Sequence, residues 1–202
     1  MPDCSTTTLS PFTRCLMAAW GITVLGGVLA VTAYSNSPGA QQDTGDEWPA
    51  DSTISLHSDL PTILLFVHPK CPCSLATVRE LQRSLGNDSD AMSIQIGLYG
   101  PEDRDDSWTD TRLKKLAEQA FADSTFVDRN GTEAKRFGAI TSGHVLAFSP
   151  TGRCLFRGGV TSARGHEGDN LGLEALRQIV AGTPNSCTTT PVFGCPIAAT
   201  NE

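Results

Sequence analysis

Two cysteines separated by one proline are the residues of this chain best suited to chemistry. Cys71-Pro72-Cys73 follows an apolar run over residues 63–67 and precedes apolar residues at positions 75, 78 and 81. The run predicts a buried strand, and the spacing predicts a helix over residues 71–85. Pro72 suits the first helical position, so Cys71 is expected at the N-cap, near unpaired N–H groups and the positive end of the helix dipole.

This position favours the charged form of Cys71. The thiolate, and not the thiol, is the nucleophile and the metal ligand in cysteine chemistry. We expect the helix N-terminus and the neighbouring Lys70 to lower the pKa of Cys71 below the free value of about 8.5. Two thiols so close together suit either exchange with disulfide bonds or binding of a soft metal ion.

Length, charge and cysteine count limit the classes of protein to which this chain could belong. The chain has 202 residues, enough for one soluble domain with appendages. Its net charge is −7 and no basic patch is visible, which argues against a nucleic-acid partner. The cysteines stand at positions 4, 15, 71, 73, 154, 187 and 195. An odd count means that at least one is free or pairs outside the chain.

An uncharged segment, residues 15–34, is long enough to cross a bilayer. Arg14 precedes it, and acidic residues follow it with no Lys or Arg before Lys70, so the positive-inside tendency predicts a cytoplasmic N-terminus at residues 1–14. A cleaved signal peptide is the alternative, because Val31-Thr32-Ala33 resembles a cleavage site. We favour the uncleaved anchor, and both interpretations place the domain on the periplasmic or extracytoplasmic side, where disulfides persist.

The rest of the chain alternates strand and helix patterns. Residues 35–59 predict a linker, residues 60–182 a folded domain, and residues 183–202 a cysteine-containing tail with neither helix nor strand. Strands are expected at 62–67, 92–99, 124–127, 145–148 and 154–157, and helices at 71–85, 108–122, 132–137 and 171–180. This order, β-α-β-α-β-α-β-β-α, predicts an α/β fold: a mixed central sheet with helices on both faces.

Over residues 60–182 the chain resembles thioredoxin-fold proteins. Phe126-Val-Asp-Arg-Asn-Gly and the run from Ala134 to Arg153 are similar to thioredoxin from its third strand through its hairpin. More narrowly, the chain resembles exported thioredoxin-like proteins labelled RedB. That resemblance is carried by His68-Pro-Lys-Cys-Pro-Cys-Ser, Thr141-Ser-Gly-His-Val, Gly158-Gly-Val-Thr, Arg164-Gly-His-Glu-Gly-Asp-Asn170 and Thr190-Pro-Val-Phe-Gly-Cys-Pro. It implies a redox role without fixing a substrate.

Two departures from ordinary thioredoxins bear on the chemistry. The C-x-C spacing closes a very small disulfide ring, and a strained disulfide is more oxidising, so we expect a thiol oxidant or isomerase. The position of the thioredoxin cis-proline, within Ser142-Gly143-His144-Val145, is expected to hold His144. His144 would then lie against the cysteine pair as a proton-transfer group, as a copper or zinc ligand, or as a loop histidine without chemistry.

Two further segments carry open alternatives. Cys187 and Cys195 form a structural disulfide in the interpretation we favour; otherwise they exchange with Cys71–Cys73, or complete a four-thiolate metal site. The loop from Arg164 to Asn170 either caps the last helix through Asp169 or Asn170, or faces the substrate with His166 contributing.

The sequence as a whole predicts a membrane-anchored, exported thiol–disulfide oxidoreductase. Cys71 would attack, Cys73 would resolve the mixed disulfide, and His144 would transfer a proton. The expected partners are protein thiols or disulfides of the exported compartment; nothing indicates an oligomer, and no glycine-rich motif indicates an organic cofactor. The main alternative is a copper or zinc delivery protein using Cys71, Cys73 and His144. A third possibility is a thioredoxin scaffold that only binds a partner.

Overall fold

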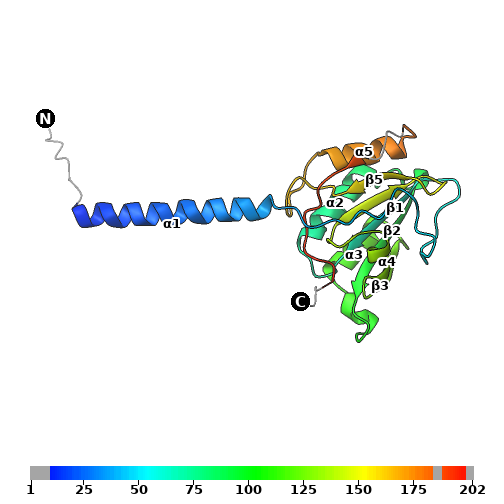
Figure 1. The fold of residues 1–202 in the computed structure, drawn as a ribbon, viewed down its shortest axis with the longest axis horizontal. Helices are drawn as coiled ribbons and strands as arrows, with labels where there is room; N and C mark the ends of the chain where they lie inside the picture. Colours follow the sequence, from blue (N-terminus) through cyan, green and yellow to red (C-terminus); the bar gives the residue numbers. More distant parts are fainter. Residues whose placement is uncertain (1–9, 184–187, 199–202) are drawn as a thin grey trace. The chain divides into compact units, whose positions relative to one another are not determined.

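The computed structural model describes residues 10–183 and 188–198, and it divides the chain between Asn36 and Ser37 into two compact units (Figure 1). The described part of the first unit holds one helix, α1 (Pro11–Ser35), in which no residue is buried. Ser10 caps this helix and Pro11 stands at its start, which suits the missing N–H of proline. α1 contains the expected span over residues 15–34. It is long and apolar enough to cross a membrane, a test that a signal sequence also passes.

A six-stranded mixed sheet forms the centre of the second unit. Its strands are β1 (Thr62–Val67), β2 (Ser93–Gly100), β3 (Thr125–Arg129), β4 (His144–Phe148), β5 (Cys154–Gly158) and β6 (Thr188–Thr189). They lie in the order β3-β2-β1-β4-β5-β6. β1, β2 and β3 are parallel, β4 runs antiparallel to β1 and to β5, and β6 is parallel to β5. All six residues of β1 are buried, as the apolar run predicts for a central strand.

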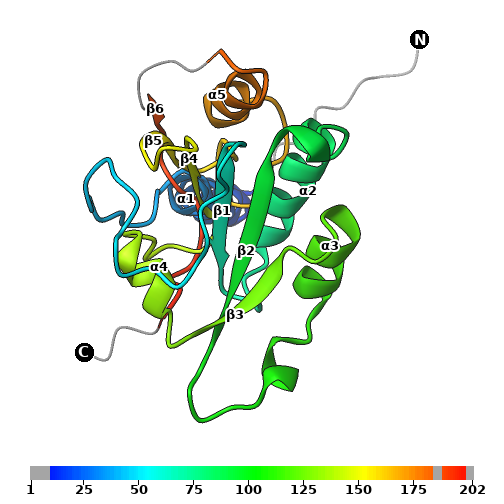
Figure 2. The same cartoon turned by 90° about the vertical axis from the view of Figure 1, so that its right-hand side faces the viewer.

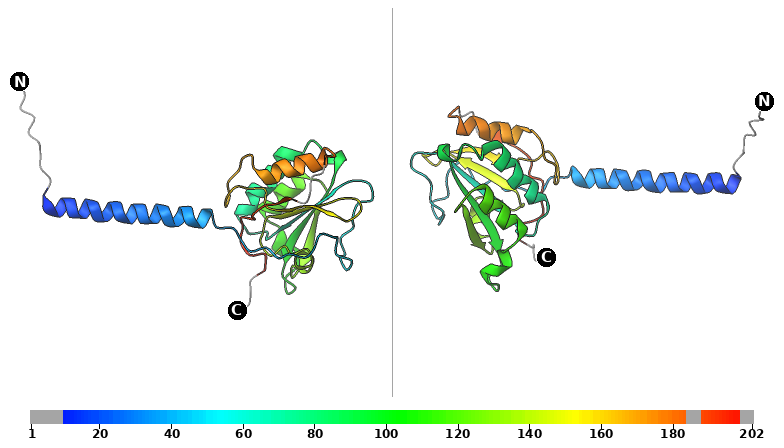
Figure 3. Two further views of the ribbon diagram at one scale, coloured as in Figure 1. Left: turned by 45° about the horizontal axis from the view of Figure 1, so that its top comes forward. Right: turned by 180° about the vertical axis from the view of Figure 1, so that it is seen from behind.

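Helices cover both faces of this sheet, as expected. α2 (Cys73–Leu85), α3 (Arg112–Ala120) and α5 (Leu171–Val180) contribute to one hydrophobic cluster, which we call the helical face. α4 (Thr132–Arg136) lies against the other cluster, which contains Phe66, Phe137 and Phe148. Figures 2 and 3 show the two layers, with α2 and α3 on the opposite side of the sheet from α4. Short 3-10 helices, η1 (Ser89–Ala91) and η2 (Asp106–Thr109), lie in the connections.

The predicted order of the elements is confirmed, and most boundaries move by one or two residues. β1 and α5 have the predicted bounds. The largest difference is the helix expected over residues 108–122, which is divided into η2 and α3. Thr111 is extended between them, and its hydroxyl accepts a hydrogen bond from the amide of Lys114, so α3 begins after this cap.

Residues 37–59, expected as a linker, belong to the folded unit and are called the strap below. The amide of Gly39 donates to the carbonyl of Val192 at 2.8 Å. The amide of Trp48 donates to the carbonyl of Gly152, also at 2.8 Å. The Trp48 ring packs edge-on against Phe137 and Phe148. The domain therefore begins near Ser37 and not near residue 60, because the strap covers the face that α4 leaves open.

Residues 188–198, which we call the tail, also belong to this unit. Contrary to the expectation of no regular structure, Thr188 and Thr189 add the edge strand β6 to β5. The chain then returns across the strap side of the sheet, drawn in red in Figure 2. Val192 is 0% and Ile197 is 3% exposed, so the tail supplies part of the core. We call the face covered by α4, the strap and the tail the covered face.

Candidate functional site

The C-x-C pair lies where β1 gives way to α2. The amide of Cys71 donates to the carbonyl of His68 at 2.9 Å, which closes the turn, and Pro72 already has helical dihedral angles. Cys71 is buried, Cys73 is half-buried, and both are free thiols. The assigned helix begins at Cys73, yet the amide of Ser74 donates to the sulfur of Cys71. The N-cap position itself is held by Pro72, one residue later than the sequence predicts, and Cys71 directly precedes it.

A third cysteine, Cys195 of the tail, lies against this pair. Both the thiol and the backbone amide of Cys195 hydrogen-bond the sulfur of Cys71. The carbonyl of Cys195 accepts from the amide of Ser142 at 2.8 Å, and an antiparallel bridge joins Thr141 to Pro196 next to it. The structure thus gathers Cys71, Cys73 and Cys195 at one place.

The three thiols differ in acidity. Burial alone would raise the pKa of Cys71, but hydrogen bonds from the hydroxyl and amide of Ser74 and from Cys195 lower it to about 7. Burial and the charge of Cys71 raise the pKa of Cys73. Burial, the hydrogen bond to Cys71 and the nearby thiolates raise the pKa of Cys195 to about 11. Near neutral pH, Cys71 is therefore the one thiol of these three that is substantially ionised.

Arg164 is a site residue that the sequence analysis missed. Its Nη1 donates to the carbonyl of Gly194 at 2.5 Å, which places the guanidinium beside the tail. Its charge lowers the pKa values of Cys73 and Cys195, and its side chain hydrogen-bonds Cys73. The sequence placed Arg164 in a polar loop, but only the return of the tail brings that loop and the thiols together.

Lys70 does not act on Cys71 in the way we expected. Its ammonium nitrogen lies 4.1 Å from the centre of the Trp108 ring, a cation–π contact. His68 stacks on Tyr99 with 5.6 Å between ring centres, and its Nδ1 accepts from the amide of Lys70 at 3.2 Å. Burial, with a smaller effect from the charge of Lys70, lowers the pKa of His68. The groups that hydrogen-bond the Cys71 thiolate are Ser74 and Cys195 instead.

Ser142 and Gly143 face the first turn of α2. The hydroxyl of Ser142 accepts from the amide of His68 at 2.7 Å and lies 2.7 Å from the hydroxyl of Ser74. Gly143 has φ of 92°, and a Cβ there would lie 3.0 Å from the hydroxyl of Thr77 in α2. No cis peptide bond occurs in the described residues. Ser142 and Gly143, the two residues before His144, are therefore the ones that face the turn carrying the cysteines.

His144 lies inside β4, on the covered face. Side chains alternate along a strand, so His144 shares its face with Leu146 and Phe148, whereas Val145 points to the helical face. The ring is 0% exposed, and neither nitrogen has a hydrogen-bond partner. Burial and the charge of Arg157 lower its pKa to about 3, so the ring is neutral. The main groups that shift the pKa values of Cys71, Cys73 and Cys195 do not include His144, so its expected proton-transfer role stays a prediction.

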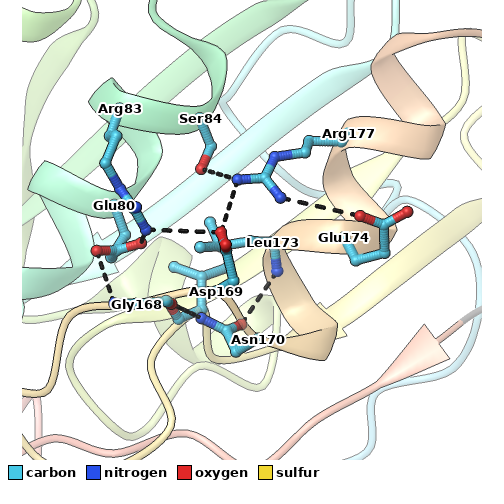
Figure 4. Close-up of polar contacts among 10 residues, drawn as sticks. Glu80, Arg83, Ser84, Gly168, Asp169, Asn170, Leu173, Glu174 and Arg177 are labelled. Carbon is cyan, nitrogen blue, oxygen red and sulfur yellow. Dashed lines mark hydrogen bonds and ion pairs between the residues drawn. The ribbon is translucent and has the colours of Figure 1, made fainter.

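The loop from Arg164 to Asn170 fastens α5 to α2 (Figure 4). Asn170 caps α5, accepting from the amide of Leu173 at 3.1 Å, which confirms one of the two predicted caps. The carboxylate of Glu80, 1% exposed, accepts from the amide of Gly168 at 3.0 Å. His166 is exposed, with Nδ1 3.3 Å from the carbonyl of Arg164. These contacts support the capping interpretation, and a substrate-facing role for His166 stays a prediction.

The remaining cysteines divide into three groups. Cys154 is 1% exposed and its thiol donates to the carbonyl of Phe156 at 3.4 Å, so it is a buried thiol in β5. Cys15 is exposed on α1. Cys4 and Cys187 lie outside the described residues. The disulfide that we favoured for Cys187 and Cys195 is not formed at Cys195, which is a free thiol.

Two further properties bear on ligands. Within residues 10–183 and 188–198, no group of three or more His, Cys, Asp or Glu side chains is arranged to hold a metal ion. A pocket of about 440 Å³ opens next to Cys195, and Arg164, Gly194 and Pro196 contribute to its lining. Most of the remaining lining is apolar: Ala40, Ala134, Ala139, Ile140, Ile197 and Ala198. The three thiols do not line this hollow, which is largely apolar and carries two charged side chains, Arg164 and Lys135.

Comparisons with known proteins agree on the fold. No family model and no curated protein matches the chain. Among solved structures, an uncharacterized conserved protein from Geobacillus kaustophilus is 19% identical at a TM-score of 0.53, covering 83% of this chain and 94% of its own. The hypothetical protein SMc02350 from Sinorhizobium meliloti is 17% identical at a TM-score of 0.54, covering 83% and 98%.

A secreted Mycobacterium tuberculosis disulfide oxidoreductase, homologous to E. coli DsbE, is 15% identical at a TM-score of 0.41, covering 63% of this chain and 84% of its own. Identities this low bear on the fold alone. The element order, the mixed sheet and the helices on both faces agree with the expectation drawn from the sequence. This chain has a thioredoxin-like fold, preceded by one apolar helix that could span a membrane.

Proposed function

We propose that this protein is a thiol–disulfide oxidoreductase whose attacking group is the Cys71 thiolate. The observation that carries the proposal is the set of hydrogen bonds around that sulfur. Ser74 and Cys195 donate to it and hold the pKa of Cys71 at about 7, although the residue is buried. A thiolate with a pKa near the ambient pH combines a large charged fraction with good nucleophilicity.

The reaction needs no cofactor. The Cys71 thiolate attacks one sulfur of a substrate disulfide, forming a mixed disulfide and releasing the other substrate sulfur as a thiolate. Cys73 then loses its proton and attacks the Cys71 sulfur, so that the second substrate thiolate leaves. The substrate disulfide is reduced to a dithiol, and Cys71 and Cys73 are oxidised to a disulfide. The reverse sequence oxidises a substrate dithiol.

The direction that we propose is oxidation of substrate thiols. The hydrogen bonds that stabilise the Cys71 thiolate favour the reduced enzyme, as does the strain of a disulfide between residues two apart. A low-pKa cysteine is also a good leaving group. The same features would suit an isomerase, which attacks and releases substrate disulfides without net oxidation.

The substrates proposed are protein thiols and disulfides on the exported side of a membrane. The length and composition of α1 support an anchor or an export signal, and the charge asymmetry around residues 15–34 supports export of the folded unit. The largely apolar pocket beside Cys195 supports a protein substrate. The resemblance to RedB-type proteins supports the same location.

The test is a redox titration of the full-length protein in detergent, with thiols trapped and assigned by mass at each glutathione ratio. The full chain is required because Asp43 of the strap bonds Arg157 at 2.8 Å, so a fragment cut within the strap would lose contacts of the domain. We expect a two-electron couple near or above about −200 mV that includes Cys71. Cys71→Ser should abolish it, and Cys154→Ser, which changes the buried thiol of β5, should not.

A metal assay of the purified protein distinguishes the oxidoreductase from the alternative, a copper or zinc delivery protein. If Cys71 and Cys73 stay reduced over the whole range and the protein carries about one copper or zinc ion, the oxidoreductase proposal fails. The metal-delivery interpretation of the sequence would then hold.

A further inference from the structure

We propose that Cys195 is a redox-active thiol of this site, and that the stable oxidised protein carries a Cys71–Cys195 disulfide. This inference rests on the proposed function and adds a third cysteine to it. Cys73 forms the first disulfide with Cys71, and Cys195 then displaces it.

The backbone around Cys195 fixes its position toward Cys71. The carbonyl of Cys195 is held by the amide of Ser142, and the amide of Cys195 points the other way, to the Cys71 sulfur. The hydroxyl of Ser142 is itself tied to His68 and Ser74, which flank Cys71 in sequence. The nucleophile and the third thiol are therefore held by one connected set of hydrogen bonds.

The tail that carries Cys195 is built into the fold on both sides of it. Val192 and Ile197 are buried, and the amide of Ile197 donates to the carbonyl of Ile140 at 2.9 Å. Gly194 packs so closely that a Cβ would lie 1.9 Å from the carbonyl oxygen of Ser142. Only glycine fits there, so the approach of the tail to Ser142 depends on position 194.

Ring geometry favours the longer connection. A disulfide needs Cβ atoms about 3.8 Å apart, whereas side chains two residues apart on a helical backbone point away from each other, so a Cys71–Cys73 bond requires Pro72 to leave its helical conformation. The thiols of Cys73 and Cys195 both hydrogen-bond Cys71, but Cys195 comes from a separate segment of the chain. A bond between Cys71 and Cys195 leaves the first turn of α2 in place.

Oxidation of Cys71 changes the charge that acts on Cys195. While Cys71 is a thiolate, its charge and its hydrogen bond keep Cys195 protonated. Once Cys71 is in a disulfide that charge is gone, and the guanidinium of Arg164 still favours the Cys195 thiolate. Cys195 is thus restrained in the reduced protein and becomes more acidic after oxidation.

The step is an exchange without net oxidation. A substrate or glutathione disulfide first oxidises Cys71 and Cys73 and is reduced to two thiols. The Cys195 thiolate then attacks the Cys71 sulfur, the Cys71–Cys195 bond forms, and the Cys71–Cys73 bond breaks. Cys73 leaves as a thiolate beside Arg164, which hydrogen-bonds it, and the proton released by Cys195 is taken up by Cys73.

The first test maps the disulfide in the full-length protein after oxidation with glutathione disulfide and acid trapping. Trypsin places Cys71 and Cys73 together on peptide 71–79, and Cys187 and Cys195 together on peptide 178–202. We expect these two peptides to be joined, and to stay joined in the double variant Cys73→Ser, Cys187→Ser, in which Cys71 and Cys195 are the only cysteines of the two peptides. Separate peptides, with an internal bond in 71–79 or in 178–202, would overturn the proposal.

The second test measures the glutathione equilibrium. Cys195→Ser removes the exchange but keeps a hydrogen-bond donor for Cys71, so only the strained disulfide remains. We expect its equilibrium constant for oxidation to fall at least tenfold, about 30 mV toward a more oxidising potential. Gly194→Ala, which changes no thiol, should shift the equilibrium in the same direction, and Cys154→Ser should not. An unchanged constant in Cys195→Ser would refute the role of Cys195. If Cys71 forms no disulfide in any variant, the proposed function itself fails.

Discussion

The two faces of the sheet are covered in different ways, and the thiol site draws on both. On the helical face, α2, α3 and α5 pack with regular apolar spacing, and Leu81, Ala117 and Leu176 are each 0% exposed. On the covered face the one short helix, α4, is completed by segments from the two ends of the folded unit, the strap and the tail. The first face presents Cys71 and Cys73, and the segments of the second present Cys195.

The two faces hold their cysteines with different rigidity. Cys71 is fixed by the start of a thirteen-residue helix whose apolar side is buried along its length. Cys195 is fixed by a few backbone hydrogen bonds in a segment with little regular structure. Segments of that kind open locally at lower free energy than packed helices do. We therefore expect the tail to control how far substrates reach Cys71.

The largest effect that tests this comparison is loss of core packing on either face. Leu81→Ala in α2 and Ile197→Ala in the tail each remove a buried side chain, and each should lower the free energy of unfolding by about 2–5 kcal/mol in denaturant titrations. Only Ile197→Ala should also speed alkylation of Cys71 at pH 9, where Cys71 is a thiolate in both proteins, because it loosens the segment that limits access to this buried thiol. If Ile197→Ala changes the unfolding free energy by less than about 0.5 kcal/mol, the tail is an appendage and not part of the core.

A smaller effect is expected at the clamp between α2 and α5. Glu80→Ala leaves the amide of Gly168 without its buried acceptor, so unfolding should cost about 1–3 kcal/mol less. Glu80→Gln keeps an acceptor, so it should lower the free energy of unfolding by less than Glu80→Ala does. Glu174→Ala is the matched control, since that carboxylate in Figure 4 is 57% exposed and pairs with Arg177 at 3.8 Å. Equal losses in Glu80→Ala and Glu174→Ala would show that the clamp contributes nothing specific.

Removing one donor to the thiolate should act on reactivity more than on stability. Ser74→Ala deletes the side-chain hydrogen bond to Cys71, so the pKa of Cys71 should rise above its value of about 7. The alkylation rate at pH 6 should then fall several-fold, about tenfold for each pKa unit gained. Ser84→Ala, a serine at the other end of α2, serves as the control. An unchanged pH profile in Ser74→Ala would mean that Cys195 and the helix N-terminus suffice.

The sequence predicts the helical face far better than the covered face, for a physical reason. Apolar spacing in residues 75–85 and 171–180 reports burial within one element, and both helices formed as predicted. The strap is largely polar, the tail has no regular apolar spacing, and the contacts of both depend on long-range partners, such as Gly39 with Val192. Cys195 and Arg164 therefore became site residues only in the folded chain. The sequence alone could not assign His144 to the covered face, because a shift of one residue moves a side chain to the other face of a strand.

The smallest effect concerns His144, for which the two interpretations predict different outcomes. A catalytic histidine beside the thiols would make His144→Leu slow in thiol–disulfide exchange, whereas a neutral ring buried on the covered face predicts an unchanged exchange rate. Its nitrogens have no partner, so His144→Leu should leave stability at pH 7 unchanged or raise it by about 1 kcal/mol. The folded pKa of about 3 lies below the ordinary 6.5, so between these values the unfolded chain binds the extra proton and stability falls as the pH falls. Denaturant titrations at pH 7 and pH 5 should show this loss in the native chain and a smaller loss in His144→Leu, and equal losses would place the titrating group elsewhere.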